Sequence, residues 1–95
     1  MHLSTLRDAV TGAIRTTMIQ VKLLAFASAA VELGWRETFT ECSPNETPRE
    51  LFRRIAPGFD VGTARVAVDS VYFSWDDAIG PGAREVAIIP PVSGG

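Results

Sequence analysis

Two stretches in the first half of the chain alternate between apolar and polar residues, as strands with one buried face do. Residues 19–23 (IQVKL) and 35–42 (WRETFTEC) follow this pattern, which predicts two strands. In the second stretch we expect the aromatic side chains on one face and the glutamates on the other. Residues 26–33 are rich in alanine and stop at Gly34, which predicts a short helix or wide turn between the strands.

The middle of the chain carries the strongest helix signals. Thr47 can accept a hydrogen bond from the Glu50 amide, while the Glu50 carboxylate reaches back to the Thr47 amide. Pro48 suits the first helical position, and Pro57-Gly58 ends the helix. The expected buried stripe consists of Leu51, Phe52 and Ile55. The arginines of this helix, expected on the solvent side or against an acidic partner, are Arg49, Arg53 and Arg54.

Three further strands are predicted in the second half, over residues 64–68, 71–75 and 84–89. The segment 76–82 is dense in aspartate, glycine and proline, which predicts a loop. The first two strands can pair as a hairpin, and the last strand can return beside the first. With the main helix packed across one face, this is the β-grasp (ubiquitin-like) arrangement, an α+β fold with a mixed sheet.

One domain, over residues 18–95, is expected in this chain of 95 residues. Residues 1–17 form a weakly amphipathic extension, for which we expect an extended reading frame, a frayed arm, or a short helix that docks on the domain or a partner. Met18 opens the first strand and is a candidate start of the domain.

The composition excludes several classes of function. Nearly half of the chain, 46%, is hydrophobic and the net charge is only −2, so a packed core is expected and a basic nucleic-acid surface is not. Cys42 and His2 are the only residues of their types, which argues against a disulfide scaffold, a metal site built on His and Cys, and a Cys-His or Ser-His nucleophile system. We expect no stably bound cofactor. A single cysteine fits the reducing cytoplasm, and no apolar stretch is long enough to span a bilayer.

Two polar features invite a chemical interpretation and a simpler one. Cys42 is a candidate sulfur-transfer thiol, but its place at a strand end favours a structural thiol. Asp76-Asp77 resembles a carboxylate pair for acid–base or metal chemistry, but the glycines and proline that follow favour a solvated turn.

The C-terminal tail is the most specific part of the sequence. Pro90-Pro91 stiffens the chain and prevents the last strand from continuing. Gly94-Gly95 has no Cβ atoms and can enter a narrow channel in another protein. A rigid exit with a slim end suits insertion of the terminal carboxylate into a partner's active site, whereas the alternative is an ordinary frayed terminus.

The last residues, REVAIIPPVSGG, resemble the C-terminal signature of the small subunit of molybdopterin synthase, a MoaD-type ubiquitin-like sulfur carrier. MIQVKLLAFASAAVELG is similar to that family's first strand and helix, so the resemblance covers residues 18–95. It implies a sulfur-donor subunit that is not catalytic alone. An ATP-dependent, MoeB-like adenylating enzyme would activate Gly95, preceded by Gly94. The resulting thiocarboxylate would deliver sulfur to a cyclic pterin phosphate precursor inside the synthase large subunit.

The resemblance also implies a docking face. Apolar side chains that the family presents to the large subunit correspond to Tyr72, Ile89 and Leu24. A core role for Leu24 and Ile89 is the alternative. The complete set of expected partner-binding residues is Leu24, Tyr72, Ile89, Pro90, Pro91, Val92 and Ser93.

Two departures from the family lie away from the tail. The family commonly has an arginine in the first helix, where this chain reads Ala29-Ala30, and often has asparagine near Asp69. Other functions remain open: a carrier for thiazole or cysteine synthesis, a ubiquitin-like modifier, or a plain β-grasp interaction module.

Overall fold

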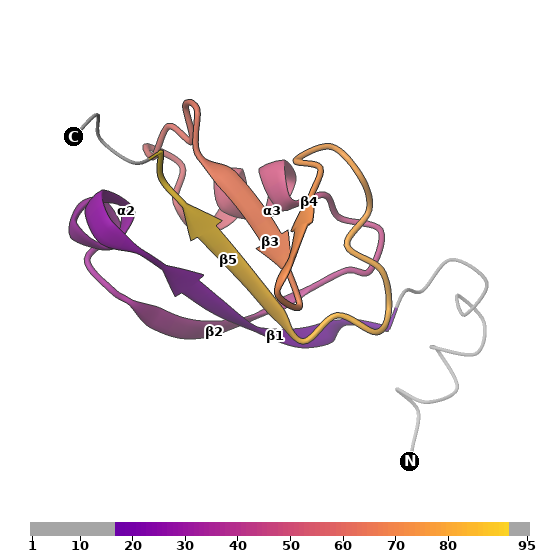
Figure 1. The fold of residues 1–95 in the computed structure, drawn as a ribbon. Coiled ribbons are helices and arrows are strands. Elements are labelled where there is room, and N and C mark those ends of the chain that lie inside the picture. The colour runs from indigo at the N-terminus through magenta and orange to yellow at the C-terminus, as the bar shows by residue number, and fades with distance from the viewer. Residues whose placement is uncertain (1–16, 92–95) are drawn as a thin grey trace, which may run out of the picture.

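The computed structural model describes residues 17–91 and shows the expected α+β fold, a five-stranded mixed sheet with α3 across one face (Figure 1). The elements are β1 (Ile19–Ala25), α2 (Ala27–Leu33), β2 (Glu37–Cys42), α3 (Pro48–Ile55), β3 (Arg65–Val68), β4 (Val71–Phe73) and β5 (Glu85–Ile89). The expected extension, apart from Thr17, and the tail from Val92 onward lie outside the described residues.

The order of the strands, β2-β1-β5-β3-β4, confirms the two predicted pairings. β1 and β2 form an antiparallel hairpin in which Val21 lies opposite Thr40. β5 returns parallel to β1, with Leu23 opposite Val86. The last strand of the chain is therefore central in the sheet, and it points toward the end where α2 lies (Figure 1).

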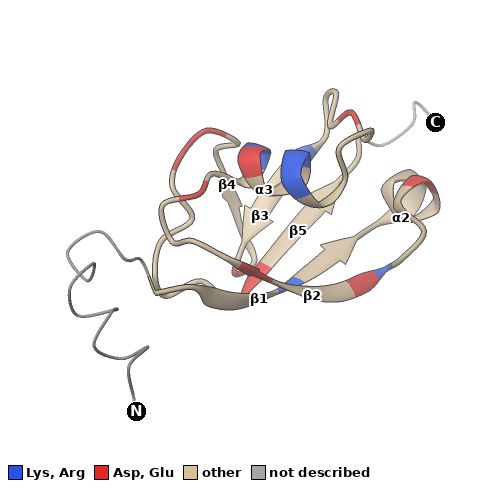
Figure 2. Ribbon diagram, turned by 180° about the vertical axis from the view of Figure 1, so that it is seen from behind, with Lys and Arg blue, Asp and Glu red and all other residues tan. Residues whose placement is uncertain are grey.

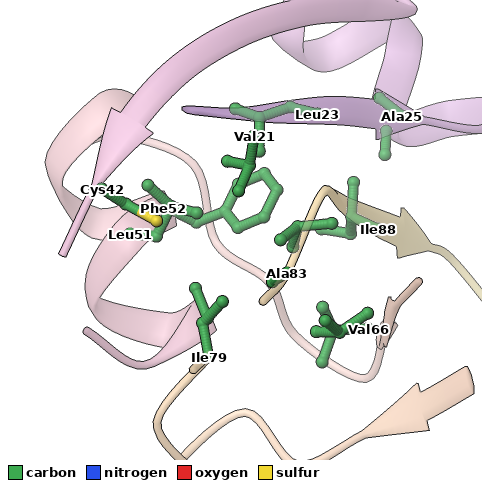
Figure 3. Packing of buried hydrophobic residues seen from close by; sticks show 13 residues of the cluster. Val21, Leu23, Ala25, Cys42, Leu51, Phe52, Val66, Ile79, Ala83 and Ile88 are labelled. Atoms are coloured by element: carbon green, nitrogen blue, oxygen red, sulfur yellow. The ribbon is translucent and has the colours of Figure 1, made fainter. Parts of the chain in front are cut away.

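The core fills the space between the sheet and α3. Side chains from β1, α3 and β5 point toward one another there, with Phe52 of α3 among them (Figure 3). Phe52, Leu51 and Leu23 are each at most 1% exposed, which confirms two residues of the predicted buried stripe. Ile55, the third, is only partly buried against this core.

The predicted start of α3 is confirmed in atomic detail. The Glu50 amide donates to Thr47 Oγ1 at 3.1 Å, and the Thr47 amide donates to Glu50 Oε1 at 3.0 Å. These bonds satisfy two amides that a helix start otherwise leaves unpaired, and Pro48 at the first position has no amide hydrogen to satisfy. The cap therefore fixes where α3 begins on its face of the sheet.

The prediction of opposite faces in β2 was wrong. Phe39 is 57% exposed and lies on the same side as Glu37 and Glu41, while Thr38 and Thr40 point inward. Side chains in a strand repeat every second residue, so the phenylalanine and both glutamates must share a face. The predicted start was also too early, because the strand begins at Glu37 and not at Trp35.

The predicted strand over residues 71–75 ends early, at Phe73. Ser74 Oγ accepts a hydrogen bond from the Asp76 amide at 3.0 Å, which turns the chain away from the sheet. Trp75 then folds inward, where its Nε1 donates to the Ala64 carbonyl at 2.8 Å and its ring meets Phe52 edge-on at 5.9 Å.

The turn between β3 and β4 is tight. Asp69 and Ser70 both have positive φ angles, 50° and 72°, as in the two-residue turns that suit the twist of a hairpin. Asp69 Oδ1 accepts hydrogen bonds from the amides of Arg84 and Glu85 at 2.9 and 3.0 Å. Asp69 thus connects this turn to the start of β5. This is a structural role for the position at which the family that the sequence resembles often has asparagine.

Candidate docking face and tail exit

The face of the sheet opposite α3 carries a continuous row of uncharged side chains. The register places Leu24 of β1 beside Ala87 of β5, Ala87 beside Ala67 of β3, and Ala67 beside Tyr72 of β4. No helix among residues 17–91 covers this face of the sheet, which is turned toward the viewer in Figure 1 and away from the viewer in Figure 2. We call this surface the open face.

A shallow groove of about 350 Å³ runs along the open face. It is lined by residues of all the strands except β2 and of two connections, namely Leu24, Phe26, Ala67, Ser70, Tyr72, Glu85, Ala87 and Ile89. The two alanines form its floor, because their small side chains lie low between Leu24 and Tyr72. The structure therefore brings together the three side chains that the sequence analysis assigned to docking.

Sequence reasoning missed Phe26 and the two alanines. Phe26 is 47% exposed directly after β1, and the alanines occupy alternate positions of short apolar strands. Alternation alone marks Ala67 and Ala87 as outward-facing. What it does not show is that they lie side by side, because this depends on the pairing of β3 with β5.

Tyr72 is exposed and contacts Arg65. Tyr72 is 62% exposed, and the Arg65 guanidinium carbon lies 4.7 Å from the centre of the tyrosine ring. This cation–π contact gives an exposed aromatic side chain of β4 a partner on the neighbouring strand β3. Leu24 and Ile89 are half-buried and are not members of the core cluster, so the alternative that they are core residues was wrong.

The tail leaves the domain at the end of the central strand. β5 ends at Ile89, Pro90 is half-buried and Pro91 is exposed. Both prolines border a small depression between α2 and the loop that precedes β3, which also contains Glu32 and Asp60. Ile89 lines the groove and precedes Pro90 directly, so groove and tail exit are continuous. Val92, Ser93, Gly94 and Gly95 lie outside the described residues.

Cys42 is placed for structure and not for reaction. It ends β2 in the core, with no exposed surface. Burial raises the pKa of its thiol, and Glu46 raises it further against an opposing effect of Arg54. Because the thiolate is the nucleophilic form, a raised pKa and a buried sulfur both oppose sulfur transfer through this residue.

Asp76 does not form a paired-carboxylate site with Asp77. Its Oδ1 accepts from Arg49 Nε at 2.8 Å and its Oδ2 from Arg49 Nη2 at 3.3 Å. The hydrogen bond from Arg49 lowers the pKa of the Asp76 carboxyl, and the charges of Arg49 and Arg53 lower it further. No group of residues in the described part of the chain could hold a metal ion. In the same part, no helix is both long and apolar enough to cross a membrane.

Comparisons with known proteins agree on the fold. No family model matches the sequence, and no curated protein matches it closely enough to be a relative. Among solved structures, SAMP1 from Haloferax volcanii superposes with a TM-score of 0.63 at 20% identity, covering 81% of this chain and all (100%) of the other. Small archaeal modifier protein 1 from H. volcanii gives 0.57 at 17% identity, covering 77% and 98%.

A candidate molybdopterin converting factor subunit 1 from Pyrococcus furiosus is also similar. It superposes with a TM-score of 0.61 at 26% identity, covering 78% of this chain and 99% of the other. The chain therefore has the compact ubiquitin-like fold shared by these modifier and converting-factor proteins, and each of them matches over nearly its whole length.

Proposed function

We propose that this chain is a sulfur carrier whose C-terminal Gly95 is converted to a thiocarboxylate, and specifically the small subunit of a molybdopterin synthase. One observation carries the proposal. The groove of the open face, which is lined mostly by apolar side chains, continues through Ile89 into the strand end from which the tail departs. A partner that binds the groove would thus also receive the tail. The similarity to a candidate molybdopterin converting factor subunit 1 supports the choice of pathway.

The chemistry requires activation of an inert carboxylate. The Gly95 carboxylate attacks the α-phosphate of ATP on an adenylating enzyme, which releases pyrophosphate and forms an acyl-adenylate. A sulfur nucleophile then displaces AMP and leaves a thiocarboxylate, a competent nucleophile at neutral pH. In the synthase large subunit this sulfur attacks the pterin precursor. ATP is a substrate of the adenylating enzyme, and the carrier itself supplies the acyl group and its delivery.

The body of the domain contributes binding free energy that the tail lacks. Ordering a flexible backbone costs about 1–2 kcal/mol per residue. Of the four residues beyond Pro91, only Val92 has an apolar side chain, so the four have little apolar surface to offset this cost. Leu24, Tyr72 and Ile89 offer such surface on a rigid sheet beside the exit, which is how we expect the body to hold the tail in a partner's active site.

Protein modification is the second candidate. A terminal glycine that can be adenylated can also be transferred to an amine, and the fold is shared with small archaeal modifier protein 1. The two functions differ in the acceptor. A modifier becomes attached to lysines of other proteins, whereas a sulfur carrier returns with a free carboxylate after each transfer.

Mass spectrometry of the intact chain tests the proposal. After incubation with its cognate adenylating enzyme, ATP and a sulfur donor, we expect a mass gain that corresponds to replacement of one oxygen by sulfur. Deletion of Gly95, or addition of one residue after it, should abolish this gain. Ala78→Ser, an exposed change in the loop before β5, should retain it. Thiolation of either altered tail would overturn the assignment of Gly95.

Adding the partner separates the two candidates. The thiolated chain is mixed with the molybdopterin synthase large subunit and the pterin precursor, and we expect loss of the thiocarboxylate together with product formation. Stable adducts on lysines of other proteins in a native extract, without this turnover, would instead favour modification.

A further inference from the structure

The sheet has two edges, and they differ in length. At one edge, β4 has three residues, Val71–Phe73, and follows a tight turn. At the other edge, β2 has six residues, Glu37–Cys42. An edge strand presents backbone donors and acceptors that can pair with another extended chain. The longer edge therefore offers the better template.

The hydrogen-bond pattern shows which groups of β2 point outward. The Ala25 amide donates to the Arg36 carbonyl at 2.9 Å, so Ala25 and Arg36 form a hydrogen-bonded pair. In an antiparallel ladder such pairs alternate with pairs that do not bond. Thr38, Thr40 and Cys42 thus bond toward β1, and the amides and carbonyls of Glu37, Phe39 and Glu41 point away from the sheet.

One of these outward groups has a partner. The Glu41 carbonyl accepts from Arg54 Nη2 at 2.9 Å, and the neighbouring Thr40 hydroxyl lies at 3.4 Å from it. Within residues 17–91, the outward amides and carbonyls of Glu37 and Phe39 have no hydrogen-bond partner. The free edge is therefore centred on Phe39.

The side chains at this edge define what can pair with it. Phe39 is 57% exposed, and Glu37 and Glu41 are exposed on either side of it. The nearby positive charges are Lys22, directly opposite Phe39 in β1, the exposed Arg36, and Arg54, whose guanidinium pairs with Glu46. Within residues 17–91 none of the three forms an ion pair with Glu37 or Glu41. A second copy that paired antiparallel about Phe39 would place Glu37 opposite Glu41, a repulsive contact.

We propose that the edge of β2 binds an extended segment of a partner protein in which an apolar residue is flanked, two positions away on each side, by basic residues. Such a strand would pair with the free backbone groups of Glu37 and Phe39. It would also place its apolar side chain beside Phe39 and a positive charge opposite each glutamate. This binding site does not include the groove or the tail, so the inference stands independently of the proposed function.

The test uses the full chain labelled with nitrogen-15 and a capped peptide of the order arginine, threonine, valine, threonine, arginine. We expect saturable shifts in the amide resonances of Glu37, Phe39 and Glu41. A matched peptide with glutamate in place of both arginines should bind at least about tenfold more weakly, because cross-strand charge pairs stabilise or destabilise a sheet by their sign. Equal affinities of the two peptides, or shifts elsewhere only, would overturn the proposal.

Two variants at one position isolate the backbone contribution. Phe39→Pro removes the outward amide hydrogen without removing a donor from the β1–β2 ladder. Phe39→Thr removes the aromatic ring but keeps that hydrogen. Peptide binding should be weaker in Phe39→Pro than in Phe39→Thr. Binding that is unaffected by proline would show that the edge does not pair.

Other occupants give different results in the free chain. If residues 1–16 cover the edge, the amides of Glu37 and Phe39 will be protected from hydrogen exchange at every concentration. If a second copy covers it, protection will rise with concentration. Either result would overturn the proposal.

A charge-reversal variant tests the edge without any peptide. In an antiparallel pair of two copies, Glu37→Lys places a lysine opposite Glu41, so this variant should dimerise at least about tenfold more tightly than the natural chain. A variant that stays as monomeric as the natural chain would contradict the proposed edge pairing.

Discussion

The two faces of the sheet differ although neighbouring residues of the same strands build them. In β1, Leu23 has no exposed surface and packs toward α3, while Leu24 is half-buried on the open face. In β5, Ile88 and Ile89 differ in the same way. Each pair has one side-chain type, so the environment alone separates its members. The covered face stabilises the fold, and the open face carries apolar surface that the fold does not use.

The difference lies in what fills the space above each face. Against the covered face, Phe52 and Leu51 of α3 pack between bulky strand residues. On the open face, the central positions are Ala67 and Ala87, which leave a groove between larger neighbours. A groove of this kind can receive apolar side chains of another protein, as pockets at the centre of protein interfaces do.

The largest expected effect separates the two leucines. Leu23→Ala should lower the free energy of unfolding by about 2–5 kcal/mol, because it removes buried contacts and leaves a cavity. Leu24→Ala should lower it by about 1 kcal/mol or less, since its side chain is already partly in water. Urea unfolding of both variants measures the difference. Similar losses would show that the faces are energetically alike.

Binding to the large subunit, unlike stability, should depend on the open face and not on the covered face. Tyr72→Glu and Ile89→Glu should each weaken binding to the large subunit by an order of magnitude or more, since buried apolar anchors commonly contribute about 2 kcal/mol. Both variants should keep a native circular dichroism spectrum. Ala78→Glu, which adds the same charge outside the groove, is the control. Folded variants with unchanged affinity, measured by calorimetry, would remove the open face from the mechanism.

A smaller effect is expected at the start of α3. Thr47→Ala removes the hydroxyl that accepts from the Glu50 amide and should cost about 1 kcal/mol of stability. Sulfur transfer should be unchanged at temperatures where the variant is folded, because the cap lies on the covered side. Reduced transfer by the folded variant would mean that this helix end also contacts a partner.

The smallest effect concerns Asp76 and pH. Its pKa in the folded state is lowered from the ordinary value of 3.8 by the hydrogen bond from Arg49. A lowered pKa stabilises the fold above the unfolded value, and this contribution disappears as pH falls through the folded value. Asp76→Asn should therefore be slightly less stable than the natural chain near neutral pH and lose that difference in acid. Denaturant titrations of both chains near neutral pH and in acid measure this difference in stability. A difference that persists in acid would contradict the role of the Arg49–Asp76 ion pair.

Local patterns were sufficient to predict most elements. The alternation of residues 19–23, the capping box at Thr47 and the proline stop after Ile89 each depend on residues close together in the chain. Two of the predictions that were wrong, the faces of β2 and the position of Trp75, failed for different reasons. The faces of β2 were misassigned although its period of two contained the answer. The inward turn of Trp75 required a contact with Ala64 that lies 11 residues away.

By itself, the sequence determined the strands, the capped helix and the order that leads to a β-grasp fold. It also marked Leu24, Tyr72 and Ile89 through family resemblance, without showing that they meet. Only the tertiary structure decided this, because the row from Leu24 to Tyr72 crosses four strands whose registers are set by long-range pairing. The free edge of β2 is likewise a tertiary property, since a strand's outward amides are defined only once its one neighbour is known.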